Sequence, residues 1–142
     1  MNTFTKKSIT AEAAKAAIAA AAAKARQMGL NMCIAITDES GDLKAFLRMD
    51  GAAKLALDIA QNKAYTAVSF GMSTDQWWDF IKEDPPLLHG ITHTPRLVVF
   101  GGGYPIKDGD QVVGAIGVSG GHYTQDMEVA KAGVQAVTGL GG

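Results

Sequence analysis

The stretch at residues 112–121, VVGAIGVSGG, organises the rest of this chain. It is apolar and rich in β-branched residues, and it follows a polar turn, KDGD, at residues 107–110. An Asp-Gly pair between two apolar runs is a strong hairpin signal. We therefore predict that residues 112–118 form the second strand of a hairpin, and that this strand lies centrally in its sheet.

The small residues of this stretch carry a further prediction. Gly114 and Gly117 remove side chains from the strand, which weakens it unless another backbone or a ligand approaches closely. Ser119, Gly120 and Gly121 then form a loop that leads into a helix, where free N–H groups can bind an anion or a carboxylate. We predict that these three residues bind a ligand. The alternative is that they serve only the turn and the packing.

Hydrophobic periodicity divides the chain into helices and hairpins. The pattern predicts helices over residues 10–28, 52–70, 74–81 and 124–137, and strands over residues 32–37, 43–49, 97–100, 104–106 and 112–118. Hairpins pair their strands antiparallel. The predicted fold class is therefore α+β, with about five strands and helices on both faces of the sheet, in a single domain over residues 1–142.

Local signals place the ends of these elements. Thr10 is a suitable N-cap for the first, alanine-rich helix, and Gly29 is its expected C-terminal stop. Gly71 has the same role after the second long helix. Residues 83–96 are predicted to be a loop, because their three prolines forbid a regular helix across them. The alanine face of the first helix can lie close to a sheet, to another helix or to a second subunit.

Composition excludes several classes of function. The chain has 142 residues and a net charge of −1, so it offers no electrostatic case for binding nucleic acid or an anionic membrane surface. Its single cysteine, Cys33, excludes an internal disulfide and is expected to be a buried apolar residue. The sequence shows neither a signal-peptide pattern nor an apolar run long enough to cross a bilayer. We therefore predict a cytoplasmic protein without a membrane segment.

Several motifs together resemble one known family. The segment GGGYPIKDGDQVVGAIGVSGG and the following QDMEVAKAGVQAV are similar to the GlcG/HbpS-like family, also described as haem-degrading or as the C-terminal domain of PduO-type adenosyltransferases. The segments AITDESGDLKAFLRMDGA and NKAYTA resemble it too, so the likeness covers nearly the whole chain. It implies a three-layer α/β/α sandwich with a five-stranded antiparallel sheet, assembled into homo-oligomers. Some members bind haem, and others are encoded among catabolic genes.

The sequence departs from the family pattern at three places. Met127 stands where the family often has a glutamate, and His122-Tyr123 stands where small residues are usual. The first helix has no histidine, although haem-binding relatives use one there. An axial iron ligand therefore cannot be carried over directly from the family.

Three histidines are candidates for metal or haem-iron binding. His89 and His93 have the i, i+4 spacing that would place two imidazoles on one helix face, so we predict them as metal ligands. The alternative is a polar loop, because glycine and prolines surround them. Tyr65 and Tyr104 are alternative phenolate ligands for iron, and aromatic packing explains them equally well.

Charged residues near the glycine loop are candidates for catalysis. His122 follows this loop and can act as a general acid or base at neutral pH, and Asp126, four residues on, can orient it. Lys63 lies among alanines on a helix face and would need a partner, Asp50 or Asp126. We predict His122, Asp126 and Lys63 as catalytic residues, each with a purely structural role as the alternative.

The predicted ligand-binding set also includes Arg48 and the glycines of the GGGYP segment, Gly102 and Gly103. Arg48 ends a strand and can make a bidentate contact with a carboxylate or a haem propionate. The glycines fit neither the dinucleotide-binding nor the P-loop pattern, so they give no support for a nucleotide site.

Three functions fit these residues. The first is a small homo-oligomeric protein that binds haem or a similar anionic small molecule. The second is an enzyme, a lyase, isomerase, deaminase or hydrolase, that moves a proton on a small carboxylated catabolic metabolite. The third is an oligomeric subunit without a ligand. A shifted haem absorbance band on titration distinguishes the first from the second, and proton-transfer activity lost in His122→Ala would favour the second.

Overall fold

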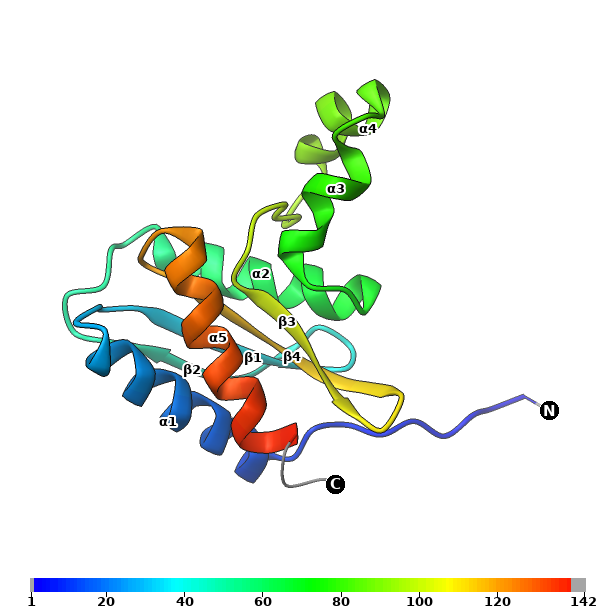
Figure 1. Cartoon of the computed structure of the whole chain (residues 1–142). Coiled ribbons are helices and arrows are strands. Elements are labelled where there is room, and N and C mark those ends of the chain that lie inside the picture. Colours follow the sequence, from blue (N-terminus) through cyan, green and yellow to red (C-terminus); the bar gives the residue numbers. More distant parts are fainter. Residues whose placement is uncertain (1, 139–142) are drawn as a thin grey trace.

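Strand β4 (Gln111–Ser119) lies inside an antiparallel sheet, as predicted from its sequence. Its neighbours are β1 (Cys33–Asp38) and β3 (Gly103–Asp108), and β2 (Leu43–Arg48) completes the order β2-β1-β4-β3. Both predicted hairpins, β1–β2 and β3–β4, are confirmed. The structure is a computed structural model that describes residues 2–138 (Figure 1).

The helices alternate with these hairpins along the chain. Within residues 2–138 they are α1 (Ala11–Gln27), α2 (Ala56–Phe70), α3 (Trp77–Ile81), α4 (Pro85–Gly90) and α5 (Tyr123–Thr138), with two short 3₁₀ helices, η1 (Thr74–Gln76) and η2 (Ile91–His93). Thr10 is the N-cap of α1, and its Oγ1 accepts a hydrogen bond from the Ala13 N–H. Gly29 and Gly71 follow α1 and α2 with φ of 71° and 62°. The predicted cap and both predicted stops are confirmed.

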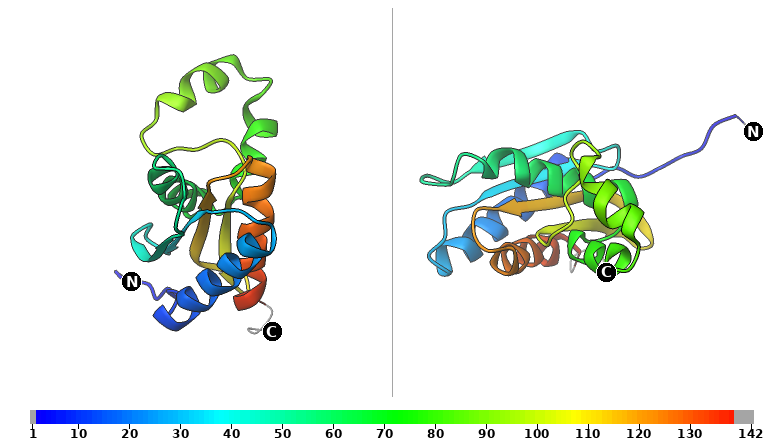
Figure 2. Two further views of the ribbon diagram at one scale, coloured as in Figure 1. Left: turned by 90° about the vertical axis from the view of Figure 1, so that its left-hand side faces the viewer. Right: turned by 90° about the horizontal axis from the view of Figure 1, so that it is seen from above.

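The two faces of the sheet carry different helices (Figure 2). Side chains alternate across a strand, so Ile34 and Ile36 of β1 pack with α1 and α5, whereas Cys33 and Ala35 pack with α2. Helices therefore lie on both faces, and the α+β class is confirmed. None of the helices within residues 2–138 is both long enough and apolar enough to cross a membrane.

The glycines of β4 explain how closely α2 approaches the sheet. A Cβ atom added at Gly117 would collide with the backbone of Ala60 and Ala64, and one added at Gly114 would collide with the Thr37 carbonyl oxygen. The expected close approach of another backbone is therefore confirmed at both glycines. At Gly117 this approach brings the middle of α2, which carries Lys63, directly onto the central strand.

The predicted fifth strand over residues 97–100 is wrong, because the sheet has four strands within the described residues. Val98 is buried, which accounts for the apolar pattern, but its N–H donates to the Thr66 hydroxyl, at 3.0 Å, rather than to a strand. The apolar pattern reported burial and not strand pairing.

The predicted loop at residues 83–96 is also partly wrong, because it contains α4 and η2. Pro85 and Pro86 stand in the first turn of α4, where a missing N–H leaves no intrahelical bond unmade.

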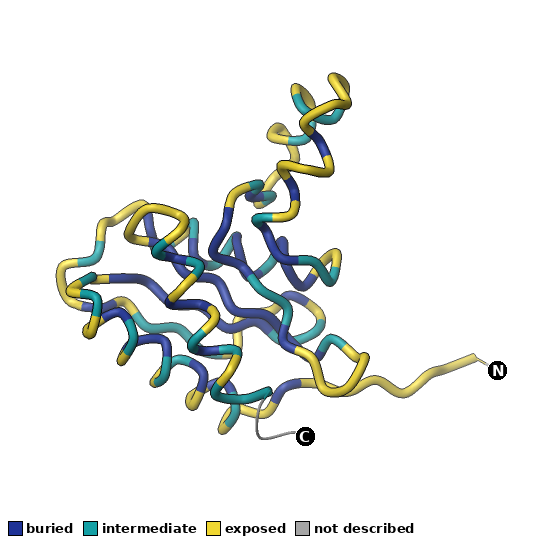
Figure 3. The backbone as a smooth tube through the Cα atoms, in the orientation of Figure 1, coloured by how far each residue is buried: buried dark blue, intermediate teal, exposed yellow. Residues whose placement is uncertain are grey.

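Residues 74–96, here called the arm, project away from the sheet and its covering helices (Figure 1). The arm is mostly exposed (Figure 3). Its two ends are tied to the body at separate points. The Gly103 N–H donates to the Thr74 hydroxyl at 2.9 Å, and the Thr66 hydroxyl donates to the Arg96 carbonyl oxygen at 3.0 Å. The arm is thus a projecting segment whose two ends are both hydrogen-bonded to the rest of the domain.

Candidate functional site

Strand register gathers most of the predicted site residues at one end of the sheet. Cys33 pairs with Arg48 on one side and with Ser119 on the other. The Val118 N–H donates to the Gly102 carbonyl oxygen at 2.9 Å, so the GGGYP segment reaches the same end. The predicted ligand-binding residues Arg48, Ser119, Gly120, Gly121, Gly102 and Gly103 therefore lie together here, and we call this the site end.

The loop at Ser119–Gly121 uses its backbone N–H groups within the chain. The Gly121 N–H donates to Asp126 Oδ1 at 3.0 Å, and the His122 N–H donates to Gln125 Oε1 at 3.0 Å. These two N–H groups are therefore not free for an anion, contrary to our expectation for the loop. Gly120 has φ of 142°, and a Cβ there would lie 2.8 Å from the Asn31 carbonyl oxygen. The loop packs tightly and needs glycine at this position.

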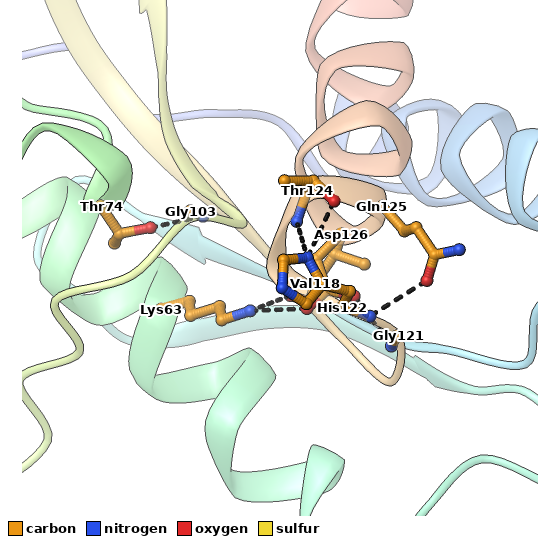
Figure 4. A network of polar contacts seen from close by, with 9 residues as sticks. All are labelled: Lys63, Thr74, Gly103, Val118, Gly121, His122, Thr124, Gln125 and Asp126. Carbon is orange, nitrogen blue, oxygen red and sulfur yellow. Dashed lines mark hydrogen bonds and ion pairs between the residues drawn. The ribbon is translucent and has the colours of Figure 1, made fainter.

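His122 caps helix α5. Its Nδ1 accepts from the Thr124 N–H at 3.2 Å and lies 2.9 Å from the Thr124 hydroxyl, while the Gln125 side chain reaches back to the His122 N–H (Figure 4). This is the reciprocal arrangement of a capping box, with histidine in place of the usual serine or threonine. A neutral ring that accepts at Nδ1 carries its proton on Nε2. His122 is therefore set up to donate from Nε2.

Lys63 and Asp126 form a buried ion pair beside this cap (Figure 4). Lys63 Nζ lies 2.9 Å from Asp126 Oδ2, and it also donates to the Val118 carbonyl oxygen at 2.8 Å. The second Asp126 oxygen accepts from Gly121, so the pair joins α2, β4 and α5. The sequence-based expectation that Lys63 would pair with Asp126 or Asp50 is met by Asp126.

Burial governs the ionisation of this pair. Loss of hydration lowers the pKa of Lys63, and the attraction of the Asp126 carboxylate opposes that change. Burial raises the pKa of Asp126, with Lys63 as the main opposing influence. The Phe100 ring centroid lies 5.1 Å from Lys63 Nζ, and a Cβ at Gly102 would lie 2.6 Å from the same atom. The ammonium is thus enclosed on every described side, and a catalytic role for the pair stays a prediction.

Arg48 lies between two open hollows at the site end. One, of about 390 Å³, is lined by Arg26, Asn31, Leu47, Arg48, Met49 and Asp50. The other, of about 350 Å³, is lined by Arg48, Asp50, Gly51, Ala52, Lys54 and Leu57. Both volumes are in the lower range of small-molecule sites, which begins at about 300 Å³. The hollow with Arg26 also adjoins the glycine loop, because a Cβ atom added at Gly120 would lie 2.8 Å from the carbonyl oxygen of Asn31, which lines the hollow.

The other predicted ligands lie elsewhere. His89 in α4 and His93 in η2 are both exposed on the arm. No cluster of three or more histidine, cysteine or carboxylate side chains suited to a metal ion is found among residues 2–138. Burial, and then the nearby Asp75 carboxylate, raise the pKa of Tyr104 to about 12, which disfavours a phenolate ligand. A metal role for the two histidines stays a prediction.

Sequence reasoning missed Arg26 and Asn31. Arg26 is explained by its position in the last turn of α1, where a cation is favourable, and this ordinary explanation hid its second position beside Arg48. Asn31 follows a glycine stop and reads as part of a turn. Arg26 and Asn31 come together with Arg48 only in the tertiary structure, where α1 packs beside the β1–β2 pair and the Met49 N–H donates to the Met32 carbonyl oxygen.

The model of the family "Haem degrading protein HbpS-like" matches residues 9–135 of the chain. This chain belongs to the HbpS-like family. It is 35% identical over 134 residues to an uncharacterised 15.0 kDa protein of Citrobacter freundii, covering 93% of this chain and 94% of that protein. The resemblance inferred from the GAIGVSG and GGGYP segments is thus confirmed.

Two solved structures have nearly the same fold as this chain. The Klebsiella pneumoniae protein ORFY aligns with a TM-score of 0.90 and 31% identity, covering 96% of this chain and 95% of that one. A PduOC:heme complex aligns with a TM-score of 0.85 and 28% identity, covering 92% and 95%. One of these relatives was therefore solved with haem bound.

Proposed function

We propose that this HbpS-like protein binds haem or a similar planar, anionic small molecule at the hollow lined by Arg26 and Arg48. The observation that carries the proposal is that these two guanidinium groups share one hollow, of about 390 Å³, without a carboxylate partner from residues 2–138 of the chain. The relative solved as a PduOC:heme complex supports haem as the first ligand to test.

The donor set fits the carboxylate groups of such a ligand. A guanidinium binds a carboxylate through two parallel hydrogen bonds. Hydrogen bonds between charged groups are stronger, and contribute more to binding free energy, than hydrogen bonds between neutral groups. Met49 and Leu47 add apolar lining to the same hollow. This combination suits a flat apolar molecule that carries acidic substituents.

The fit to an iron ligand is narrower. Haem iron is held by an axial side chain such as histidine. His122 is the histidine at the site end, but its Nδ1 accepts from Thr124, so Nε2 carries the proton in the capped state. Iron binding through Nε2 would require the other tautomer and loss of this hydrogen bond. While Nδ1 accepts from the Thr124 N–H, His122 can donate a hydrogen bond from Nε2–H to an oxygen atom of a ligand.

Titration with two porphyrins tests the proposal. Haemin and iron-free protoporphyrin share their carboxylates, so binding through the arginines predicts saturable binding of both, followed by absorbance or fluorescence quenching. Arg48→Ala and Arg26→Ala should each weaken binding roughly tenfold to hundredfold, the loss expected for one charge-assisted contact. Lys44→Ala is the matched control, because Lys44 is an exposed cation on the same strand as Arg48, outside the hollow.

Three results would count against this function. The first is the absence of saturable binding of either porphyrin by the parent protein. The second is binding that both arginine variants leave intact. The third is binding of haemin alone, which would indicate that iron and not the carboxylates directs recognition. In the first case, small carboxylated metabolites become the next ligands to screen.

A further inference from the structure

The two hollows on either side of Arg48 form one continuous trough. The first is the hollow with Arg26, and we call the second, which contains Lys54, the Lys54 hollow. Arg48 and Asp50 line both of them. A ligand that enters the hollow with Arg26 can therefore extend past Arg48 into the Lys54 hollow.

The turn after β2 joins the two hollows. The Ala52 N–H donates to the Met49 carbonyl oxygen at 3.1 Å, and Gly51 between them has φ of 83°, a conformation that favours glycine. Gly51 lines the Lys54 hollow, and a Cβ atom added there would lie 3.1 Å from Nδ2 of Asn31, which lines the hollow with Arg26. The chain thus passes from one hollow to the other with no side chain between them at Gly51.

Cations outnumber carboxylates in the lining of this trough. It holds three cations, Arg26, Arg48 and Lys54, and one carboxylate, Asp50. All four residues are exposed, and none of them belongs to an ion pair within residues 2–138. An unpaired excess of two positive charges attracts anions, and a ligand with two acidic groups balances it.

Apolar side chains lie on both sides of Arg48. Leu47 and Met49 line the hollow with Arg26, whereas Ala52 and Leu57 line the Lys54 hollow. The two volumes, about 390 and 350 Å³, are each close to the lower limit of about 300 Å³ for small-molecule sites, so a ligand that enters both has an extended frame. The trough therefore suits an apolar frame whose two acidic groups are set apart.

We propose that the ligand of this site is a dianion that spans Arg48, with one acidic group between Arg26 and Arg48 and the other between Arg48 and Lys54. This inference rests on the proposed function, because the hollow with Arg26 is one half of the trough. Lys54 and Asp50 are then specificity-determining residues. Lys54 favours the second acidic group, and Asp50, which borders both hollows, repels acidic groups placed elsewhere in the trough.

Two porphyrins that differ in one carboxylate test the need for a dianion. Iron-free protoporphyrin has two carboxylates, and its monomethyl ester has the same ring with one. The parent protein should bind the diacid about tenfold more tightly than the monoester, measured by fluorescence quenching, because the ester loses one charge-assisted contact.

The variant Lys54→Ala tests where the second carboxylate binds. It should weaken binding of the diacid about fivefold, the effect of one exposed charge pair, and leave binding of the monoester within about twofold. The single carboxylate of the monoester binds between the two guanidinium groups, where bidentate contacts are available. Lys15→Ala is the matched control, because Lys15 is an exposed lysine of α1 outside both hollows, and it should change neither affinity.

The variant Asp50→Asn tests the repulsion inside the trough. It removes the one carboxylate of the lining and keeps the size of the side chain, so it should tighten binding of the diacid about twofold to fivefold. Weaker binding of the diacid by Asp50→Asn would contradict the role given to Asp50.

The outcomes separate this inference from the proposed function. If neither porphyrin binds, or if Arg26→Ala and Arg48→Ala bind them like the parent, the proposed function and the dianion both fail. If binding needs both arginines but the parent does not distinguish the diacid from the monoester, only the dianion is overturned. An equal loss of both affinities in Lys54→Ala, or no loss of either, also overturns the dianion alone.

Discussion

Lys63 and Asp126 face each other across 2.9 Å with 0% and 3% of their side chains exposed, and this contact joins α2 to the start of α5. The same carboxylate accepts from the Gly121 N–H, so one residue fixes both the buried lysine and the glycine loop. The site end of the sheet is therefore held together from inside. Arg48 and His122 lie on the outer side of this support, where a ligand can reach them.

Removing one member of this pair should be costly, because the other is left as a buried charge. We expect Lys63→Met or Asp126→Asn alone to lower the free energy of unfolding by about 3–5 kcal/mol. The double variant should lose clearly less than the sum of the two. Denaturant unfolding of the four proteins measures this. Lys7→Met is the control, since Lys7 pairs with Asp108 at 3.2 Å on the surface and should cost less than about 1 kcal/mol. Additive losses would contradict the pairing.

Gly117→Ala should destabilise the fold through a backbone collision. The new methyl group would meet the Ala60 carbonyl oxygen, and neither α2 nor β4 can move without disturbing the core. We expect a loss of about 1–3 kcal/mol or more. Gly90→Ala is the matched control, because a Cβ at Gly90 meets nothing within 4 Å and should be neutral or slightly stabilising. Equal melting temperatures for the two variants would show that α2 does not lie this close to β4.

Two substitutions of His122 distinguish its role as the N-cap of α5 from a role in binding the ligand. Asparagine is a good N-cap, so His122→Asn should keep the stability of the parent, whereas His122→Ala should lose about 1 kcal/mol. Thermal unfolding measures this difference. If porphyrin binding falls equally in both variants, the imidazole contacts the ligand. If it falls only in His122→Ala, the cap matters and the ring does not. A His122→Asn protein as unstable as His122→Ala would refute the cap.

Acid should release the N-terminal segment from the β1–β2 turn. Hydrogen bonds from the Ser40 and Ser8 hydroxyls and from Lys6 lower the pKa of Glu39 to about 2. A carboxyl whose folded pKa is depressed stabilises the fold above its unfolded pKa of 4.5, and this stabilisation is lost as pH falls from 4.5 toward about 2. The stability difference between the parent and Glu39→Gln should therefore shrink over this range. A difference that stays constant with pH would contradict the assignment.

Local sequence signals predicted much of the fold because the turn, strand and capping residues of this chain have strong conformational preferences. The Asp-Gly turn, the apolar β-branched run of β4 and the capping Thr10 act over a few residues and agree with the tertiary structure. The partner of Lys63 was also within reach, since a lysine among alanines needs a carboxylate and only two were candidates.

The arm and the wrongly predicted fifth strand show what local sequence signals do not predict. Burial of Val98 comes from α2, which the local pattern does not report, so an apolar run at residues 97–100 resembles a strand. Pro85 and Pro86 act as helix starters or helix breakers depending on which residue begins the helix. Arg26 and Arg48 line the same hollow because α1 packs beside β2. The residues next to either arginine in the sequence do not indicate this.

Backbone NMR during titration with iron-free protoporphyrin tests the central claim most directly. This ligand has the carboxylates and lacks the iron, so it avoids paramagnetic broadening. We predict that the amide signals of Asn31, Arg48 and Gly120 shift with saturation, together with the Nε–H signals of Arg26 and Arg48. The signals of His89 and His93 on the arm should stay in place. Shifts confined to the arm, or no saturable shift at the site end, would contradict it.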